Sequence, residues 1–373
     1  MMEMFQLLKL MVDHNASDLF LSVGAPPNVK VDGLTRPVNT AALKPGETKA
    51  LAHSVMNERQ IRQFEETMEC NLSVSVEGIG RFRYNMYVQK NETAMVVRYI
   101  KSKIPSFDEL GLPAVLRELI MLKRGLVLIV GSAGSGKSTT LASMIDYRNQ
   151  NATGHILCIE DPIEFMHEHK KSIVDQREVG IDTLSYEEAL RNAMREAPDV
   201  IMIGEIRDRM TMQSAISYAE TGHLCVSTLH ANNANQAIDR VINFFPEDAQ
   251  RQLFMDLSLN LKGVMSQRLI PSVQKGRQAL AVEVMLASAY ISDLIQKGQI
   301  DTIKSVMAKG NDEGMKTFDQ SLFDLYDSGK ITLDEALRNA DSQTDLAVRV
   351  RLTGKHFASG GPALGLKPDD PRG

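Results

Sequence analysis

The sequence has 373 residues, of which 43% are hydrophobic and 24% charged, with a formal net charge of −5. This length suits two or three domains with a large core, and the acidic balance argues against a general nucleic-acid binder, although it leaves room for a local basic channel. The cysteines Cys70, Cys158 and Cys225 are scattered, which is typical of buried thiols in a reducing compartment rather than of disulfides or a metal site.

Neither a secretory signal nor a membrane helix is evident. The N-terminal residues lack a basic segment followed by an apolar core and a cleavage site, and the apolar runs are far shorter than the ~20 residues that a membrane helix needs. We therefore expect a cytoplasmic protein whose membrane contact comes only through partners.

The first hundred residues mix strand and helix patterns, which predicts a small α+β domain over residues 1–100. Helices are expected over 4–12 and 48–66. Expected strands cover residues 18–23, 28–33, 71–76, 80–88 and 95–100.

On the expected strand 80–88, Arg81, Arg83 and Asn85 share one face and apolar side chains share the other. Such a polar face is either the solvated side of a half-buried sheet or a set of arginines that reach the phosphates of a neighbouring nucleotide. We keep the second interpretation as a hypothesis for Arg83 and for Arg98.

Prolines and glycines predict an interdomain linker over residues 101–113, where a hinge can lie. Beyond it, fully apolar runs alternate with helical patterns, which predicts an α/β domain with a parallel sheet covered by helices on both faces. The expected strands are residues 126–130, 156–159, 200–203 and 224–229.

After Pro246 a long helical pattern is expected to run from Leu253 through Met265, followed by a strand over 278–286 and short helices to about Leu346. This places the second domain at residues 114–346. The remainder, 347–373, is rich in glycine and proline near its end and is predicted to be disordered.

The phosphate-binding pattern G-x-x-x-x-G-K-[ST] lies between the first apolar run and a helical pattern. This order of strand, glycine-rich turn and helix is the setting that the pattern requires. Its glycines let the backbone turn tightly around phosphate oxygens, and the lysine and the following serine suit phosphate and Mg²⁺. A glycine-rich turn that binds nothing is the alternative. The pattern predicts nucleoside triphosphate binding by Gly131, Ser132, Ala133, Gly134, Ser135, Gly136, Lys137, Ser138 and Thr139.

Carboxylates follow the next two apolar strands. Glu160, Asp161 and Glu164 come after the strand 156–159, and Glu205 comes after 200–203. Ligands usually bind beyond the carboxyl ends of parallel strands, where γ-phosphate hydrolysis needs one carboxylate to orient water and another to support Mg²⁺. The alternative is an acidic surface loop.

Arginines and histidines adjoin these strands. Arg195 precedes the strand 200–203 and Arg207 follows it; each is either a surface residue or a charge-neutralising finger. His230, at the carboxyl end of the strand 224–229, is a candidate to sense the γ-phosphate, whereas His223 at the other end is expected to be structural. The histidine pair lacks further ligands at the spacing of a metal site.

Together these segments resemble the secretion-superfamily ATPases, the hexameric motors of type IV pili and type II secretion. The matching motifs are the run from Met194 to Asp208, the acidic box Glu160–Phe165, the histidine box from Thr221 to His230, and the segments Ser17–Leu19 and Gly80–Arg83. The resemblance covers roughly residues 1 to 345 and implies a RecA-like P-loop core preceded by a PAS-like domain.

The resemblance favours the pilus retraction branch, because the longer N-terminal region and tetracysteine insertion usual in assembly and secretion members are not seen here. Principal retraction ATPases carry an A-I-R-N-L-I-R-E segment, whose arginines are replaced here by Ser292 and Gln296. This departure is similar to the accessory retraction ATPases, although a principal retraction ATPase remains the alternative.

By resemblance, Lys137 and Ser138 bind ATP and Mg²⁺, Glu164 activates water, and Glu205 supports the metal. Arg83, Arg98 and Arg195 are candidate fingers. The implied assembly is a homohexamer that works at the inner membrane with a PilC-like pilus platform protein and a principal retraction ATPase, driving twitching motility. Two other functions stay open: a nucleic-acid translocase, which the acidic balance disfavours, and a nucleotide-gated ring without turnover.

Overall fold

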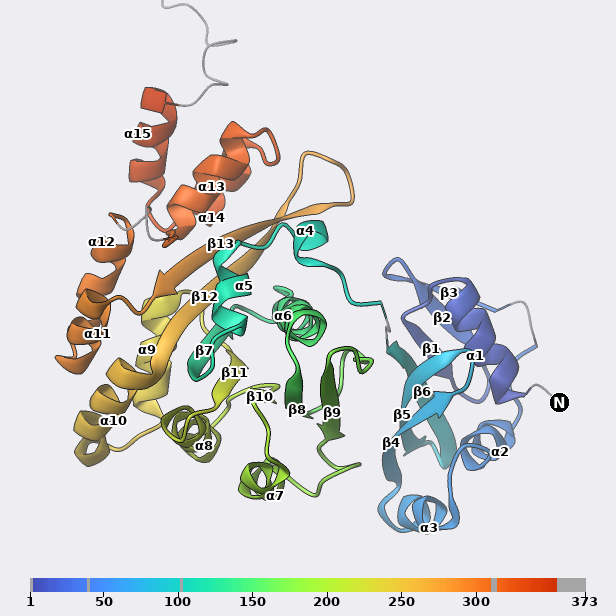
Figure 1. The fold of residues 1–373 in the computed structure, drawn as a ribbon. Coiled ribbons are helices and arrows are strands. Elements are labelled where there is room, and N and C mark those ends of the chain that lie inside the picture. The colour runs from blue at the N-terminus through green and yellow to red at the C-terminus, as the bar shows by residue number, and fades with distance from the viewer. Residues whose placement is uncertain (1–2, 39–40, 101–102, 310–313, 354–373) are drawn as a thin grey trace, which may run out of the picture.

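The computed structural model describes residues 3–38, 41–100, 103–309 and 314–353. Within these residues the chain forms two β-sheets, each with its own helices, as Figure 1 shows. The first sheet is built from residues before 101 and the second from residues after 124. The division into domains at 1–100, 101–113 and 114–346 stays a proposal.

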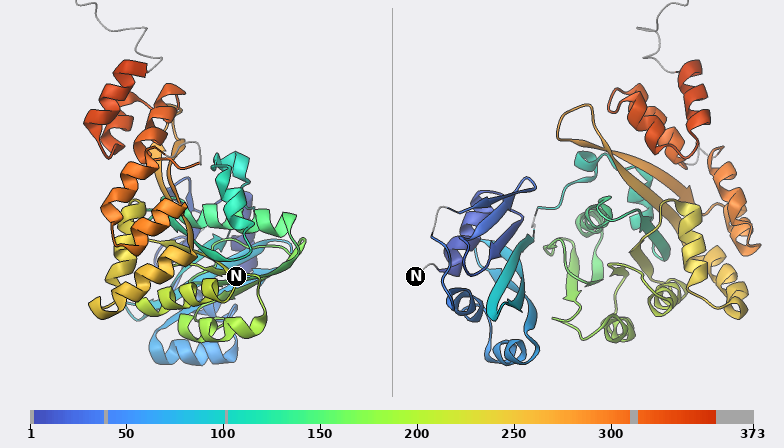
Figure 2. Two further views of the ribbon diagram at one scale, coloured as in Figure 1. Left: turned by 60° about the vertical axis from the view of Figure 1, so that its left-hand side comes forward. Right: turned by 180° about the vertical axis from the view of Figure 1, so that it is seen from behind.

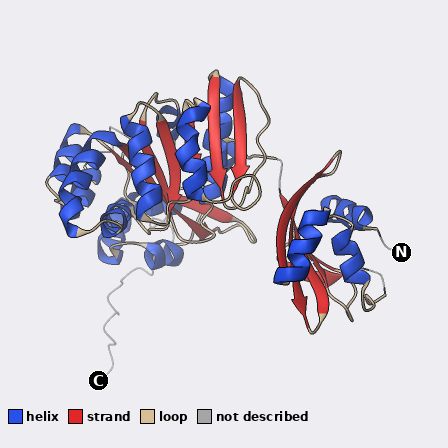
Figure 3. Ribbon diagram, turned by 90° about the horizontal axis from the view of Figure 1, so that it is seen from below, coloured by secondary structure: helices blue, strands red, loops and turns tan. Residues whose placement is uncertain are grey.

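The first sheet is antiparallel throughout, in the order β3-β2-β1-β6-β5-β4. Its strands are β1 Asp18–Leu21, β2 Asn28–Val31, β3 Leu34–Pro37, β4 Glu69–Val76, β5 Gly80–Gln89 and β6 Glu92–Ile100. Helices α1 Met4–Asp13, α2 Glu47–His53 and α3 Glu58–Thr67 lie on the face that points away from the second sheet (Figure 3).

Side chains of β5 alternate as predicted. Phe82, Tyr84 and Met86 are fully buried in the core beneath the helices, whereas Arg83 on the other face is partly exposed. The helix expected over 48–66 is two helices instead: α2 ends at His53, and a capping box at Asn57 starts α3.

The second sheet has the order β13-β12-β7-β11-β10-β8-β9 and is parallel except for β13, which pairs antiparallel with β12. Its strands are β7 Gly125–Val130, β8 Gly154–Glu160, β9 Ser172–Glu178, β10 Val200–Ile203, β11 Leu224–Leu229, β12 Leu261–Pro271 and β13 Gln278–Leu286. The five strands predicted beyond residue 120 are confirmed, and β9 and β12 are additional.

The helix predicted through Met265 is wrong beyond Asn260. Helix α10 ends there and β12 begins at Leu261, pairing with β7 on one side and β13 on the other. The apolar spacing of Leu261, Val264 and Met265 fits a helix as well as a buried strand, so the strand is decided by tertiary pairing rather than by the local pattern.

Helices cover both faces of this sheet, as predicted. Alternate residues of β7 belong to the cores on opposite faces of the sheet. Leu126 and Leu128 lie in the core shared with α7 to α11, and Val127 and Ile129 lie in the core shared with α4 to α6. The helices of this part are α4 Phe107–Leu110, α5 Val115–Ile120, α6 Lys137–Asn151, α7 Tyr186–Ala193, η1 Met194–Glu196, α8 Arg209–Glu220, α9 Ala234–Asn243, α10 Glu247–Asn260 and α11 Ala289–Gln296.

The last helices gather at the end of the molecule far from the first sheet (Figure 2). They are η2 Ile300–Thr302, α12 Ile303–Met307, α13 Phe318–Asp327, α14 Leu333–Asn339 and α15 Gln343–Thr353. A disordered tail from residue 347 was expected, but α15 continues to Thr353 because Leu346 and Val350 are buried against α13 and its neighbours. Residues 354–373 lie outside the described part.

Part of the expected linker is packed rather than extended. Within residues 101–113, a capping box between Ser106 and Glu109 starts α4, and Phe107 is buried in the core of the second sheet. The two sheets also touch directly, because the buried carboxylate of Glu178 lies 3.5 Å from Arg81 Nη2 and accepts a hydrogen bond from Ser73. In the described part of the chain, every helix is too short or too polar to cross a bilayer.

Candidate active site

A cavity of about 480 Å³ opens beyond the carboxyl ends of β7, β8, β10 and β11. Residues from all four strand ends line it, as expected for a ligand site in a parallel sheet. The lining includes Gly134, Gly136, Lys137, Ser138, Thr139, Glu160, Asp161, Glu164, His167, Tyr186, Glu205, Arg207, Thr228 and His230. The structure therefore brings together the glycine-rich loop, the acidic box and His230.

The loop from Gly131 to Gly136 joins β7 to α6, which begins at Lys137. Gly134 and Gly136 have φ values of 75° and 88°, in the left-handed region that glycine tolerates best. A Cβ at Gly131 would approach the carbonyl oxygen of Gln267 to 2.7 Å, so close packing against β12 also requires glycine there. The loop thus presents the first N–H groups of α6 to the cavity.

Lys137 lies inside this loop. Its Nζ donates hydrogen bonds to the carbonyl oxygens of Gly131 and Ser132, each at 2.9 Å. Burial lowers the pKa of the lysine, while the carboxylates of Glu205 and Glu164 act in the opposite direction. The ammonium group is therefore held beside the backbone of the glycine-rich loop by two acceptors that phosphate oxygens can replace.

Gln267 on β12 supports the loop from behind. Its Nε2 donates to the carbonyl oxygen of Ser135 at 2.6 Å, and the side chain is 1% exposed. The sequence pattern alone does not single out this residue, because it does not predict β12 and no local motif surrounds the glutamine.

Glu205 follows β10 and has partners on both sides. Oε1 lies 2.8 Å from His230 Nε2, and Oε2 accepts a hydrogen bond from Arg207 Nε at 2.6 Å. Arg207 also lies 3.5 Å from Asp161. The turn after β10 is itself fixed by Thr228, whose hydroxyl donates to the carbonyl oxygen of Gly204 at 2.6 Å.

The acidic box contains two different kinds of carboxylate. Glu160 is 7% exposed, and burial raises its pKa to about 7, against the effect of a hydrogen bond from Gln176. Glu164 is exposed at the cavity. An accessible carboxylate beside the loop can orient a water molecule, whereas the buried one is placed to organise the backbone around it.

The candidate finger arginines lie outside the cavity lining. Arg98 is exposed and donates to Asp18 at 2.9 Å, and Arg195 is exposed and contacts Asn192 at 3.4 Å. Arg83 is partly exposed on β5 and pairs in register with Arg98 of β6. Within the described residues of a single chain, these arginines therefore do not line the cavity that contains Lys137.

Two further lining residues were not predicted. His167 is 8% exposed and burial lowers its pKa to about 4, so the ring is neutral at physiological pH. Tyr186, at the start of α7, has a pKa raised by burial. His223 lies at the opposite end of β11 and contacts Thr221 and the carbonyl oxygen of Tyr218, away from the cavity.

The oxygen donors at the cavity suit Mg²⁺. Ser138 and Glu205 both line it and offer a hydroxyl and a carboxylate. The described residues contain no group of three or more His, Cys, Asp or Glu side chains that would hold a metal ion without a ligand. Mg²⁺ in nucleotide sites is commonly held by one or two protein oxygens together with phosphate oxygens, so the donor set fits.

Comparisons with known proteins agree with this geometry. Residues 6–350 match the model of the family described as type II/IV secretion system protein. The chain is 51% identical to the type IV pilus ATPase PilU of Pseudomonas aeruginosa, over 100% of this chain and 99% of that protein. It is 43% identical to the type IV pilus retraction ATPase PilT of the same organism, over 91% of this chain and 98% of that one.

Solved structures show the same fold. The crystal structure of the pilus retraction motor PilT with bound ADP aligns with a TM-score of 0.87 at 42% identity, covering 93% of this chain and 100% of that one. The ATPase DotB of Legionella pneumophila aligns with a TM-score of 0.72 at 24% identity, over 89% of this chain and 94% of that one, which shows the fold alone.

Proposed function

The chain belongs to the type II/IV secretion system protein family and is an ATPase, and on that premise we propose that it is a motor for type IV pilus retraction, of the accessory type that PilU represents. The observation that carries the proposal is the cavity in which the glycine-rich loop, Glu164, Glu205 and His230 meet. Its supporting comparison is the match to PilU along the whole chain.

In this proposal the loop binds the triphosphate of ATP. Lys137 moves its hydrogen bonds from the loop carbonyls to phosphate oxygens, and the N–H groups at the start of α6 bind further oxygens. Ser138 and Glu205 would hold Mg²⁺, whose charge lowers the repulsion between the phosphates and the attacking oxygen. Glu164, the exposed carboxylate at the cavity, orients the water that attacks the γ-phosphate.

Arg83, Arg98 and Arg195 are proposed to complete the site from neighbouring surfaces of a homohexamer. Each has a side chain that is at least partly exposed, which suits a residue that reaches across a subunit boundary. An arginine placed on the γ-phosphate neutralises charge that develops during hydrolysis. In this proposal, movement of the two domains about residues 101–113 converts ATP hydrolysis into mechanical work.

The accessory role rests on α11. Where principal retraction ATPases carry two arginines, this chain has Ser292 and Gln296, and the neighbouring Tyr290 is 56% exposed. We propose that this surface works beside PilT and a pilus platform protein at the cytoplasmic face of the inner membrane. Retraction of pili would then drive twitching motility.

The proposal is tested by turnover and by retraction. Purified protein should hydrolyse ATP, and Glu164→Gln should lower kcat by about a hundredfold or more, because the amide cannot accept the proton of the attacking water. In cells, deletion of this gene alone and together with its PilT paralogue should slow the shortening of labelled pili. Turnover equal in the wild type and the variant contradicts the catalytic role, and strong stimulation by DNA favours a translocase instead.

A further inference from the structure

Gln176 lies on β9, beside the acidic box, and has no role in the chemistry described so far. Its amide makes three hydrogen bonds to the segment of residues 160–167. Nε2 donates to Glu160 Oε1 at 2.9 Å and to the carbonyl oxygen of Phe165 at 2.8 Å. Oε1 accepts a hydrogen bond from the N–H of His167 at 2.9 Å. Both amide hydrogens and one acceptor site are therefore used.

These contacts fix the segment on both sides of Glu164. Glu160 is the last residue of β8, and Phe165 and His167 follow Glu164 in the chain. Between them, Ile163 is 2% exposed and anchors the backbone from inside. The side chain of Glu164 is therefore exposed, while these contacts fix the residues before and after it in the chain.

Glu160 provides the direct link. Its buried carboxylate accepts the hydrogen bond from Gln176, and the backbone N–H of Glu164 stabilises the same carboxylate and so lowers its pKa. A buried carboxylate that loses a donor becomes unfavourable and rearranges. Removing the amide of Gln176 thus disturbs the group that holds the backbone of Glu164.

The geometry points to Gln176 as a positioning residue for ATP hydrolysis, which acts through Glu160 to hold Glu164 in the place from which it orients water. The inference rests on the proposed role of Glu164. It predicts that substitution of Gln176 slows the chemical step of hydrolysis and does not weaken ATP binding, because Gln176 is not among the residues that line the cavity.

The test compares Gln176→Leu, Glu164→Gln and the double variant in the full-length protein, with kcat, KM and affinity for a fluorescent ATP analogue measured for each. We expect Gln176→Leu to lower kcat about tenfold while KM and affinity stay within about twofold of the wild type. The double variant should be no slower than Glu164→Gln, because two residues that act through one group are not additive.

A matched control is Gln252→Leu on α10, where the amide donates to Asp256 on an exposed helix face; its turnover should equal that of the wild type. Gln176→Glu provides a second variant if the leucine variant does not fold. It keeps the length of the side chain and an acceptor for His167, but it loses the donors and places a like charge beside Glu160. Its kcat should fall at least as far as that of Gln176→Leu.

The outcomes separate the two ideas. A normal kcat in the Gln176 variants, a change confined to KM, or an additional loss in the double variant overturns the positioning role while the proposed function stands. Full turnover by Glu164→Gln removes the catalytic role of Glu164, and the inference about Gln176 fails with it.

Discussion

His230 Nε2 lies 2.8 Å from Glu205 Oε1 across the ends of two neighbouring parallel strands, β11 and β10. The other carboxylate oxygen, Oε2, accepts a hydrogen bond from Arg207 at 2.6 Å. Glu205 is therefore oriented from both sides. The contact thus joins the carboxylate proposed to support Mg²⁺ to the histidine proposed to sense the γ-phosphate.

Loss of the histidine should slow hydrolysis more than it weakens binding. His230→Ala removes one of the two groups that orient Glu205, so we expect kcat to fall about tenfold while ATP affinity changes by about twofold or less. Steady-state turnover and nucleotide titration measure the two effects. The control is His223→Ala at the other end of β11, which should retain normal kcat; equal losses in both variants would contradict the assignment.

The phosphate-binding role of Lys137 is tested by affinity. Lys137→Ala removes the cation that is held by the carbonyl oxygens of Gly131 and Ser132, and ATP affinity should fall at least about tenfold because no other lysine lines the cavity among the described residues. Fluorescent nucleotide titration gives the value. Lys297→Ala, on the exposed end of α11, is the matched control. Unchanged affinity and unchanged pilus-dependent movement in Lys137→Ala would reject the site.

The hydrogen bond from Gln267 on β12 to the glycine-rich loop leads to a separate prediction. Gln267→Leu leaves the carbonyl oxygen of Ser135 without its 2.6 Å donor in a buried place, which costs on the order of 1–3 kcal/mol. The loop should then relax, so KM for ATP should rise several-fold with a smaller change in kcat. Steady-state turnover measures KM and kcat, and thermal unfolding with and without nucleotide checks the loop, since a weaker loop gives less stabilisation by ATP. A KM equal to the wild-type value would show that the contact does not maintain the loop.

Local patterns predicted the parts of the site that lie within one stretch of sequence. The glycine loop, the acidic box and the residue at the end of β10 all follow apolar strands, and parallel pairing brings such ends together. Contacts between distant residues were not predictable. Gln267 lies 132 positions from Ser135, and Gln176 is an ordinary polar residue on a strand, β9, that has no apolar run. Their roles come from pairing in space, which a single sequence does not display.

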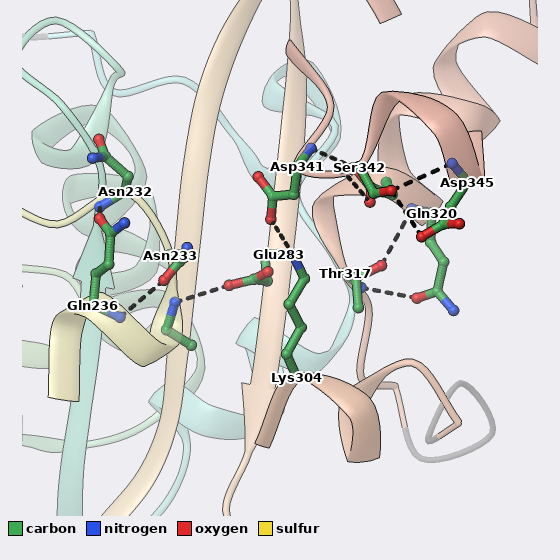
Figure 4. Close-up of polar contacts among 12 residues, drawn as sticks. Asn232, Asn233, Gln236, Glu283, Lys304, Thr317, Gln320, Asp341, Ser342 and Asp345 are labelled. Carbon is green, nitrogen blue, oxygen red and sulfur yellow. Dashed lines mark hydrogen bonds and ion pairs between the residues drawn. The ribbon is translucent and has the colours of Figure 1, made fainter. Parts of the chain in front are cut away.

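A buried carboxylate outside the lining of the cavity gives a prediction on pH. Glu283 on β13 is 2% exposed and accepts a hydrogen bond from the N–H of Ala234 at 2.8 Å (Figure 4). Its pKa is raised from 4.5 to about 7, mainly by burial and to a smaller extent by Asp341, against the opposing effects of the Ala234 N–H, Lys304 and Arg268. The folded protein thus binds a proton that the unfolded chain has released between pH 4.5 and 7.

The sign of the effect follows from this difference. Because the folded state holds more protons than the unfolded state in that window, the free energy of unfolding should fall as pH rises from about 4.5 to 7. Above pH 7 the loss of folding stability that comes from ionising the buried Glu283 is complete, and it amounts to roughly 3 kcal/mol. Glu283→Gln keeps an acceptor for Ala234 but carries no charge, so the variant should gain stability relative to the wild type at pH 8 and little at pH 5. Urea unfolding of both proteins at the two pH values measures the difference.

The matched control is Glu187→Gln on α7, where the carboxylate is solvent-exposed and pairs with Arg191; its unfolding midpoint should stay close to that of the wild type at both pH values. If Glu283→Gln changes stability equally at pH 5 and pH 8, the carboxyl group does not titrate in this window. The effect would then belong to packing around Ala234 rather than to the proton. A difference that appears only at pH 8 instead identifies Glu283 as a buried group whose ionisation lowers the stability of the folded protein.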